Sequence, residues 1–169
     1  MEKDIEEKIV REAERIGEDC LFSAKGHFYA AQFWTDLHLW LGIPMAILAA
    51  ISGGSALSQF DYHNIVAGAL ALIVTALAAV STFLNPNEKS SIHGKAGNGY
   101  NILREQLRAF SEIDASLHQD EEALLRRLNE FRGQKKELDQ NSPQIPHWAY
   151  KRAKRGIEAG EGNYKIDNT

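Results

Sequence analysis

The sequence has very little of what most small enzymes and metalloproteins need. Its 169 residues include one cysteine, Cys20, which excludes an intrachain disulfide and a thiolate metal site. The six histidines show no ligand spacing. Nothing resembles a nucleophile elbow, HExxH or a paired-carboxylate site, and the run GKAGNG at 94–99 lacks P-loop spacing. We therefore expect no metal, no cofactor and no enzymatic activity.

An excess of positive charge is also missing. Lys and Arg number 19 against 23 Asp and Glu, giving a net charge of −4 and no general polycation signature for nucleic acid. The balance shifts along the chain, because acidic residues exceed basic ones over residues 1–36 and nearly equal them over 85–169. Local basic clusters can still bind anions.

Charge is absent altogether from residues 37–57 (LHLWLGIPMAILAAISGGSAL) and 65–84 (IVAGALALIVTALAAVSTFL). As a helix at about 1.5 Å per residue, each stretch spans roughly 30 Å, the thickness of a bilayer's hydrocarbon core. A buried hairpin in a soluble core is the alternative, but so short a chain has little else to cover both stretches. We predict a two-helix transmembrane hairpin, 37–84. Its lack of Asp, Glu, Lys and Arg argues against a proton relay or a transporter built on intramembrane charges.

The flanks of the hairpin predict its orientation. The short connection at 58–64 has no Lys or Arg, whereas the other side carries Lys25, Lys89, Lys95, Arg104 and Arg108. By the positive-inside rule both termini lie in the cytoplasm. Trp34 and Trp40 then lie at the inner interface, and Phe60 and Tyr62 at the outer one. The first apolar stretch follows a long charged segment, so we do not interpret it as a signal peptide.

Helical periodicity extends on both sides of the hairpin. Apolar residues recur every three or four positions over 1–36, which predicts an amphipathic cytosolic helix continuing into the first span. The same spacing from about 90 to 138, as one long helix or a helical hairpin, predicts packing against it. The predicted faces are Ile5, Ile9, Ala13, Ile16, Cys20, Ala24, Phe28, Ala31 and Trp34, and Ile92, Ala96, Tyr100, Leu103, Leu107, Phe110, Ile113, Leu117, Leu124, Leu128, Phe131 and Leu138.

Prolines mark the expected breaks. Pro44 predicts a bend in the first span. Asn85-Pro86-Asn87-Glu88 predicts a kink after the second span and a new helix at once, with Asn85 as N-cap. The two prolines within 141–146 end the helical region before a basic segment, 147–157. We thus predict an all-α membrane protein, with a cytosolic helical region at 85–157 and a flexible tail at 158–169.

Small residues recur at four-residue intervals in both spans and allow close helix packing, either within the hairpin or between subunits. They are Gly42, Ala46, Ala50 and Gly54, then Ala67, Ala71, Thr75 and Ala79. Two spans cannot enclose an aqueous path, so conduction requires a homo-oligomer, for which a tetramer is one option. The polar residues that could line or gate a pore, or else bond to their own helices or anchor at the interface, are His38, Ser52, Ser55, Ser81 and Thr82.

Two basic clusters are candidate sites for a nucleotide, because cations beside aromatic rings hold phosphates and stack bases. Attraction to anionic lipid headgroups or a merely solvated helix face explains them equally. The first cluster is His93, Lys95, Arg104 and Arg108; the second is Trp148, Tyr150, Lys151, Arg152, Lys154 and Arg155.

The order of these elements resembles the SLATT family, two-transmembrane effector domains associated with SMODS nucleotidyltransferases and SLOG proteins. The resemblance covers residues 10–155 and rests on Leu41–Leu57, Ser81–Lys89 and His93–Arg108. It implies a pore-forming effector of a bacterial anti-phage system, in the inner membrane. Its signal would be a nucleotide or oligonucleotide made by a neighbouring nucleotidyltransferase, and its effect depolarisation with growth arrest or death. The competing interpretation is a non-conducting membrane anchor whose cytosolic helices recruit a partner protein.

Overall fold

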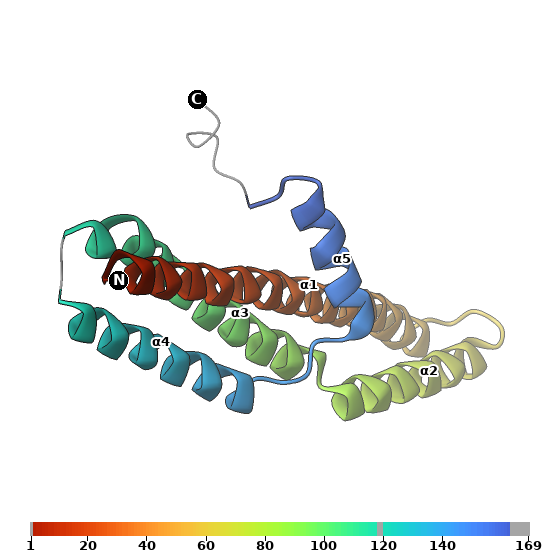
Figure 1. Cartoon of the computed structure of the whole chain (residues 1–169). Coiled ribbons are helices and arrows are strands. Elements are labelled where there is room, and N and C mark those ends of the chain that lie inside the picture. Colours follow the sequence, from red (N-terminus) through yellow and green to blue (C-terminus); the bar gives the residue numbers. More distant parts are fainter. Residues whose placement is uncertain (1, 118–119, 163–169) are drawn as a thin grey trace. The chain divides into compact units, whose positions relative to one another are not determined.

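The computed structural model describes residues 2–117 and 120–162, and within these ranges it is helical without strands (Figure 1). The predicted tail falls largely on residues 163–169, outside the described part. The α-helices are α1 (Glu2–Ala56), α2 (His63–Leu84), α3 (Pro86–Ala109), α4 (Glu121–Asn141) and α5 (His147–Glu158). A π-helical turn (Phe110–Asp114) and a 3₁₀ turn (Ala115–Leu117) follow α3.

The chain divides into two compact units. One, the hairpin unit, is Gln32–Ser91; the other, the helical unit, combines Met1–Ala31 with Ile92–Thr169. Helix α1 crosses from one unit to the other without interruption, as the continuous apolar periodicity predicts, and it passes through Pro44. Helix α3 likewise contains residues of both units.

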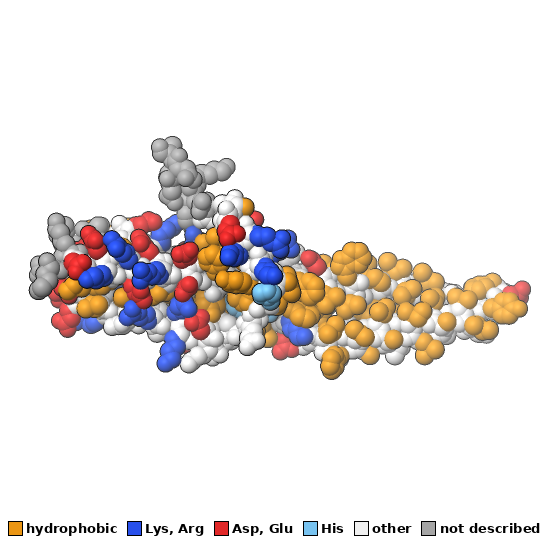
Figure 2. All heavy atoms as spheres, turned by 45° about the vertical axis from the view of Figure 1, so that its right-hand side comes forward, with side chains coloured by type: hydrophobic (Ala, Val, Ile, Leu, Met, Phe, Trp, Pro, Cys, Tyr) orange, Lys and Arg blue, Asp and Glu red, His pale blue; other side chains and the backbone are white. Residues whose placement is uncertain are grey.

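The hairpin unit exposes its apolar side chains. Only 11% of the most apolar window of the first long helix and 6% of that of the second are buried within the chain. Figure 2 shows these hydrophobic side chains covering the surface of the hairpin. A soluble core helix would be mostly buried, so the exposure favours a bilayer over the buried-hairpin alternative. Length and composition make both helices candidates to cross a membrane.

The predicted break between α2 and α3 is present. Asn85 lies in the left-handed region, with φ 43° and ψ 57°, and its backbone N–H donates to the carbonyl of Ser81 at 3.0 Å. Asn tolerates this conformation better than other residues with a side chain do. Pro86 then begins α3, where its missing N–H costs nothing. The amide of Asn85 also donates to the Glu88 carboxylate.

The core of the helical unit lies between α1, α3 and α4. The segment from 90 to 138 is a helical hairpin rather than one long helix. Phe110 and Phe131 meet edge to face, with ring centroids 5.5 Å apart. The buried cluster contains Ile9, Ala13, Ile16, Cys20, Ala24, Tyr100, Leu103, Leu107, Phe110, Ala115, Leu124, Leu128 and Phe131.

Four large members of the predicted apolar faces are exposed rather than buried, namely Phe28, Ile92, Ile113 and Leu117. Ile113 and Leu117 are 56% and 66% exposed, and Ala115 is buried instead. The π-helical turn at Phe110–Asp114 is the reason, because its wider turn rotates the following side chains relative to a 3.6-residue period. The predicted face is therefore interrupted after Phe110 and resumes in α4, where Leu124, Leu128 and Phe131 are buried.

Candidate functional site

The seam of the hairpin contains hydroxyl groups. Ser52 donates from α1 to the carbonyl of Ala67 on α2 at 2.8 Å, and Ser55 is 9% exposed. Of the other polar candidates, Ser81 is half-buried, whereas Thr82 and His38 are exposed. Ser52 and Ser55 thus face the partner helix of their own hairpin, leaving His38 and Thr82 on its surface.

Most of the small residues lie outside that seam. Gly42 is half-buried and Ala67 is buried, whereas Ala46, Ala50, Gly54, Ala71, Thr75 and Ala79 are exposed. A Cβ added at Gly42 or Gly54 would meet no atom within 4 Å. Packing within the described residues therefore does not explain these glycines, and the small-residue face is available to another helix.

One polar cluster of the hairpin unit has the composition of a membrane interface. The Lys89 ammonium lies 4.4 Å from the ring centroid of Trp34, and the hydroxyls of Thr35 and Ser90 are 2.7 Å apart. Trp and Lys side chains are common at the membrane interface, because each has an apolar part that can lie in the lipid and a polar end that stays hydrated.

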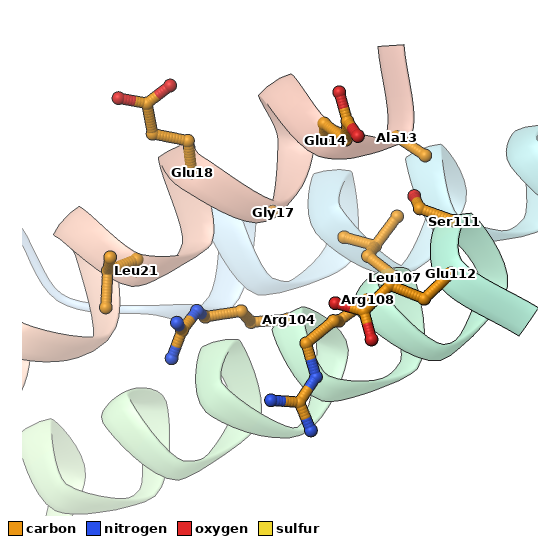
Figure 3. Close-up of a pocket in the computed structure, with 10 residues that line it drawn as sticks. All are labelled: Ala13, Glu14, Gly17, Glu18, Leu21, Arg104, Leu107, Arg108, Ser111 and Glu112. Atoms are coloured by element: carbon orange, nitrogen blue, oxygen red, sulfur yellow. The ribbon is translucent and has the colours of Figure 1, made fainter. Parts of the chain in front are cut away.

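A groove between α1 and α3 holds the two arginines of the first basic cluster (Figure 3). Its volume is about 250 Å³, and Gly17 opens it on the α1 side opposite Leu107. Arg104 extends toward Leu21, whereas Glu14 and Glu18 direct their carboxylates away from both arginines. The full lining is Ala13, Glu14, Gly17, Glu18, Leu21, Arg104, Leu107, Arg108, Ser111 and Glu112.

Some of the polar groups that line the groove already have a hydrogen-bond partner within the chain. An Arg104 guanidinium nitrogen donates to the carbonyl of Gly162 at 3.2 Å. Ser111 Oγ is buried and has no hydrogen-bond partner among the described residues. His93 and Lys95, predicted with the arginines, do not line the groove. Lys95 is exposed, and His93 is buried elsewhere on α3.

His93 pairs with a second buried histidine. His27 of α1 is 1% exposed and His93 is 6% exposed, and their Nδ1 atoms are 2.9 Å apart. Because an N–H···N bond needs one donor and one acceptor, the pair holds one proton between the two Nδ1 atoms. The ring of Tyr100 stacks on His27 at 5.6 Å. The Tyr100 hydroxyl donates to Asp139 at 2.8 Å, and Lys135 donates to the same carboxylate at 2.9 Å.

Burial governs the acidity of this network. It lowers the pKa of His27 to about 4, helped by the neighbouring His93, and it also lowers the pKa of His93. Burial raises the pKa of the Cys20 thiol to about 12 and raises that of Tyr100. The side chains of His27, His93, Tyr100 and Cys20 are therefore neutral at pH 7. Cys20 is an unreactive thiol on the apolar face of α1, where the sequence predicts it.

Sequence reasoning missed His27 as a functional residue. A signal was available, because His27 follows Cys20 and Ala24 at helical spacing and so lies on the predicted apolar face of its segment. His93 precedes Ala96 and Tyr100 in the same way. Two polar side chains on two apolar surfaces that pack together need hydrogen-bond partners. The nearest partner for each histidine is the ring of the other.

The second basic cluster lies on α5. Its four cations, Lys151, Arg152, Lys154 and Arg155, are all exposed, and Trp148 and Tyr150 are 42% and 44% exposed. Ala149 and Ala153 are fully buried and define the opposite face of the helix. The structure thus keeps these six residues on one short helix, separate from the lining of the arginine groove.

Comparison with known families finds a match over nearly the whole chain. A model of the SMODS and SLOG-associating 2TM effector domain family 4 covers residues 7–167. The chain belongs to this SLATT family. No curated protein and no solved structure matches it.

Membership of the SLATT family explains the exposed hairpin, since its members are membrane effector domains of SMODS- and SLOG-associated systems. The two long apolar helices are consistent with the two transmembrane segments of this family. The helical unit of this SLATT domain presents a groove that contains two arginines and, separately, the basic helix α5.

Proposed function

We propose that this SLATT domain is a homo-oligomeric pore of the bacterial inner membrane, with both termini in the cytoplasm. The observation that carries the proposal is the exposure of two charge-free helical stretches within one chain. Two helices cannot surround water, and the small-residue face that lies outside the hairpin seam offers a surface on which copies can pack. Opening of such a pore depolarises the membrane and arrests growth or kills the cell.

The assembly has a direct test in the small-residue face. Gly54→Leu and Ala71→Leu place a large side chain on that face, which keeps neighbouring backbones apart. We expect smaller oligomers and weaker toxicity from both variants. Gly53→Leu is the matched control, because Gly53 is exposed, has open space around its Cβ position and lies one residue off the stripe. Unchanged oligomer size and toxicity in Gly54→Leu and Ala71→Leu would remove this face as the subunit contact.

For the trigger, we propose a nucleotide or oligonucleotide from the neighbouring nucleotidyltransferase, bound in the arginine groove. Two guanidinium groups one helical turn apart suit bidentate contacts to phosphate, and the α1 carboxylates point away from them. A ligand that binds the closed and open states with different affinity shifts their populations.

Membrane potential separates this function from that of an anchor. A voltage-sensitive dye reports depolarisation in cells that express the chain with its active neighbour. Arg104→Gln with Arg108→Gln is expected to keep the oligomer but lose the response to the neighbour. Arg126→Gln with Arg127→Gln removes the same charge from the exposed side of α4 and should respond normally. If no combination depolarises the cells, the chain is a membrane anchor that recruits a partner.

A further inference from the structure

Helix α5 packs on the part of α1 that precedes the first span in sequence. The rings of Tyr150 and Phe22 are 6.3 Å apart, and the Arg152 guanidinium lies 4.5 Å from the ring of Tyr29. Ile145, just before α5, fills the space where Gly26 has no Cβ, since a Cβ there would lie 2.9 Å from it. The fold therefore brings a segment distant in sequence onto residues 22–29 of α1.

That part of α1 is juxtamembrane by sequence. Tyr29 lies eight residues before Leu37, where the charge-free stretch begins, and eight residues of helix rise about 12 Å. The headgroup layer adds about 5 to 7 Å to each side of the hydrocarbon, and the electrostatic screening length is about 8 Å at physiological salt. A long cationic side chain held against Tyr29, as Arg152 is, is thus within electrostatic range of the membrane surface.

The outward face of α5 combines cations with an aromatic ring. Trp148, Lys151 and Arg155 are spaced i, i+3 and i+7, so they share one face, opposite the buried Ala149 and Ala153. Residues 147–158 contain four basic residues and one acidic residue, although the whole chain is negative.

The acidic groups near α5 are already engaged. Glu158 pairs with Lys154 at 3.8 Å, and Glu161 pairs with Lys25 at 2.7 Å and accepts from Tyr29. In the part of the chain that the structure describes, neither Lys151 nor Arg155 takes part in an ion pair. Two cations beside an exposed tryptophan therefore remain for an external anion.

We propose that this face of α5 docks on the anionic phospholipid headgroups of the membrane that holds the hairpin. Phosphodiester anions are the chemistry recognised, and lipid is the source, because the contacts with Phe22, Gly26 and Tyr29 hold α5 beside the juxtamembrane turns of α1. Lys151 and Arg155 bind the headgroups, and Trp148 inserts its ring at the interface. The proposal rests on the membrane insertion in the proposed function and is independent of conduction.

Fluorescence of Trp148 tests the docking in the full chain. Trp34→Phe with Trp40→Phe leaves it as the sole tryptophan. The protein is reconstituted in brominated phosphatidylcholine, with or without about 30 mol% phosphatidylglycerol, which supplies the negative surface. We expect a blue shift and quenching only with phosphatidylglycerol, reversed by high salt. Each of Lys151→Gln and Arg155→Gln should lower the docked-to-undocked ratio about fivefold, whereas Arg126→Gln with Arg127→Gln should leave it unchanged.

Trypsin sensitivity gives a second readout that needs no substitution. In the unmodified chain, cleavage after Lys151 and Arg155 should slow in vesicles that contain phosphatidylglycerol. Equal quenching and equal cleavage in neutral and anionic vesicles would overturn the proposal. A short oligoadenylate that shifts Trp148 emission in neutral vesicles, with the shift lost in Lys151→Gln, would also overturn it and make α5 the nucleotide site. Ion flux through the same vesicles reports the pore separately.

Discussion

The buried histidine pair should make the helical unit unstable in mild acid. The pKa of His27 is about 4 in the folded protein and about 6.5 when exposed on unfolding. Between these values the unfolded chain binds more protons, so the free energy of unfolding falls as pH falls. Integrated from pH 8 to pH 4.5, this group alone accounts for a loss of about 2.5 kcal/mol. The lowered pKa of His93 adds a loss of the same sign.

The surroundings of the pair do not offset this loss. The nearest carboxylate network, Asp139, is already bound by Tyr100 and Lys135, and Cys20 is neutral. A second proton at the two Nδ1 atoms would place two N–H groups against each other across a 2.9 Å contact and leave one ring positively charged in a buried site. The lowered pKa values of Glu12 and Glu161 act only below their ordinary value of 4.5, so a measurement above that pH isolates the histidines.

Thermal unfolding of the purified protein in nanodiscs, followed from pH 8 to pH 4.5, measures the effect. For a folded unit of this size the midpoint should fall by about 10 °C. His27→Gln with His93→Gln keeps two side chains that can bond to each other but cannot titrate, so its midpoint should change much less. His147→Gln removes an exposed histidine and should keep the wild-type slope. A wild-type midpoint that is constant over this range, or a double variant as acid-sensitive as the wild type, would refute the reasoning.

Three substitutions test the contacts around the pair by chemical denaturation of the same protein. Gly97→Ala places a Cβ 2.7 Å from the Phe28 ring and should cost about 1–3 kcal/mol, as overpacking does, whereas Gly94→Ala meets no atom and should stabilise α3 by about 0.5–1 kcal/mol. The opposite order would show that Phe28 moves aside freely. Tyr100→Phe loses the bond to Asp139 and should cost about 1–2 kcal/mol, and a neutral result would mean that water replaces it.

Local signals predicted most of the helices. The charge-free stretches predicted the two long apolar helical segments. Pro86 predicted the end of α2 and the start of α3, and the prolines at 143 and 146 predicted the end of α4 and the start of α5, each to within a few residues. Each of these signals acts on the backbone of its own segment. The exposure of Ile113 and Leu117 was not predicted, because no residue in the 110–117 segment indicates a π-helical turn.

The candidate sites were harder to predict from the sequence, because they depend on which helix faces pack against each other. Arg104 and Arg108 line the same groove, since one helical turn separates them, but the groove itself exists because Gly17 of α1 lies opposite Leu107. His93 was assigned to the same cluster from its nearness in sequence. His93 lies 11 and 15 residues before the two arginines, which separates it from them by roughly 16 to 22 Å along the helix axis, and only the packing of α1 on α3 brings it to His27.

The groove and the histidine pair lie on the same two helices, so ligand binding should oppose the acid effect. A ligand that binds only the folded unit stabilises it by about 2.7 kcal/mol at a concentration of one hundred times its Kd, close to the loss expected from His27. A short oligonucleotide that binds Arg104 and Arg108 at that concentration should therefore restore the midpoint at pH 4.5 to its value at pH 8. Arg104→Gln with Arg108→Gln should abolish the restoration and leave the acid slope intact. Restoration that survives this double variant would place the ligand elsewhere in the helical unit, because both arginine contacts would then be dispensable.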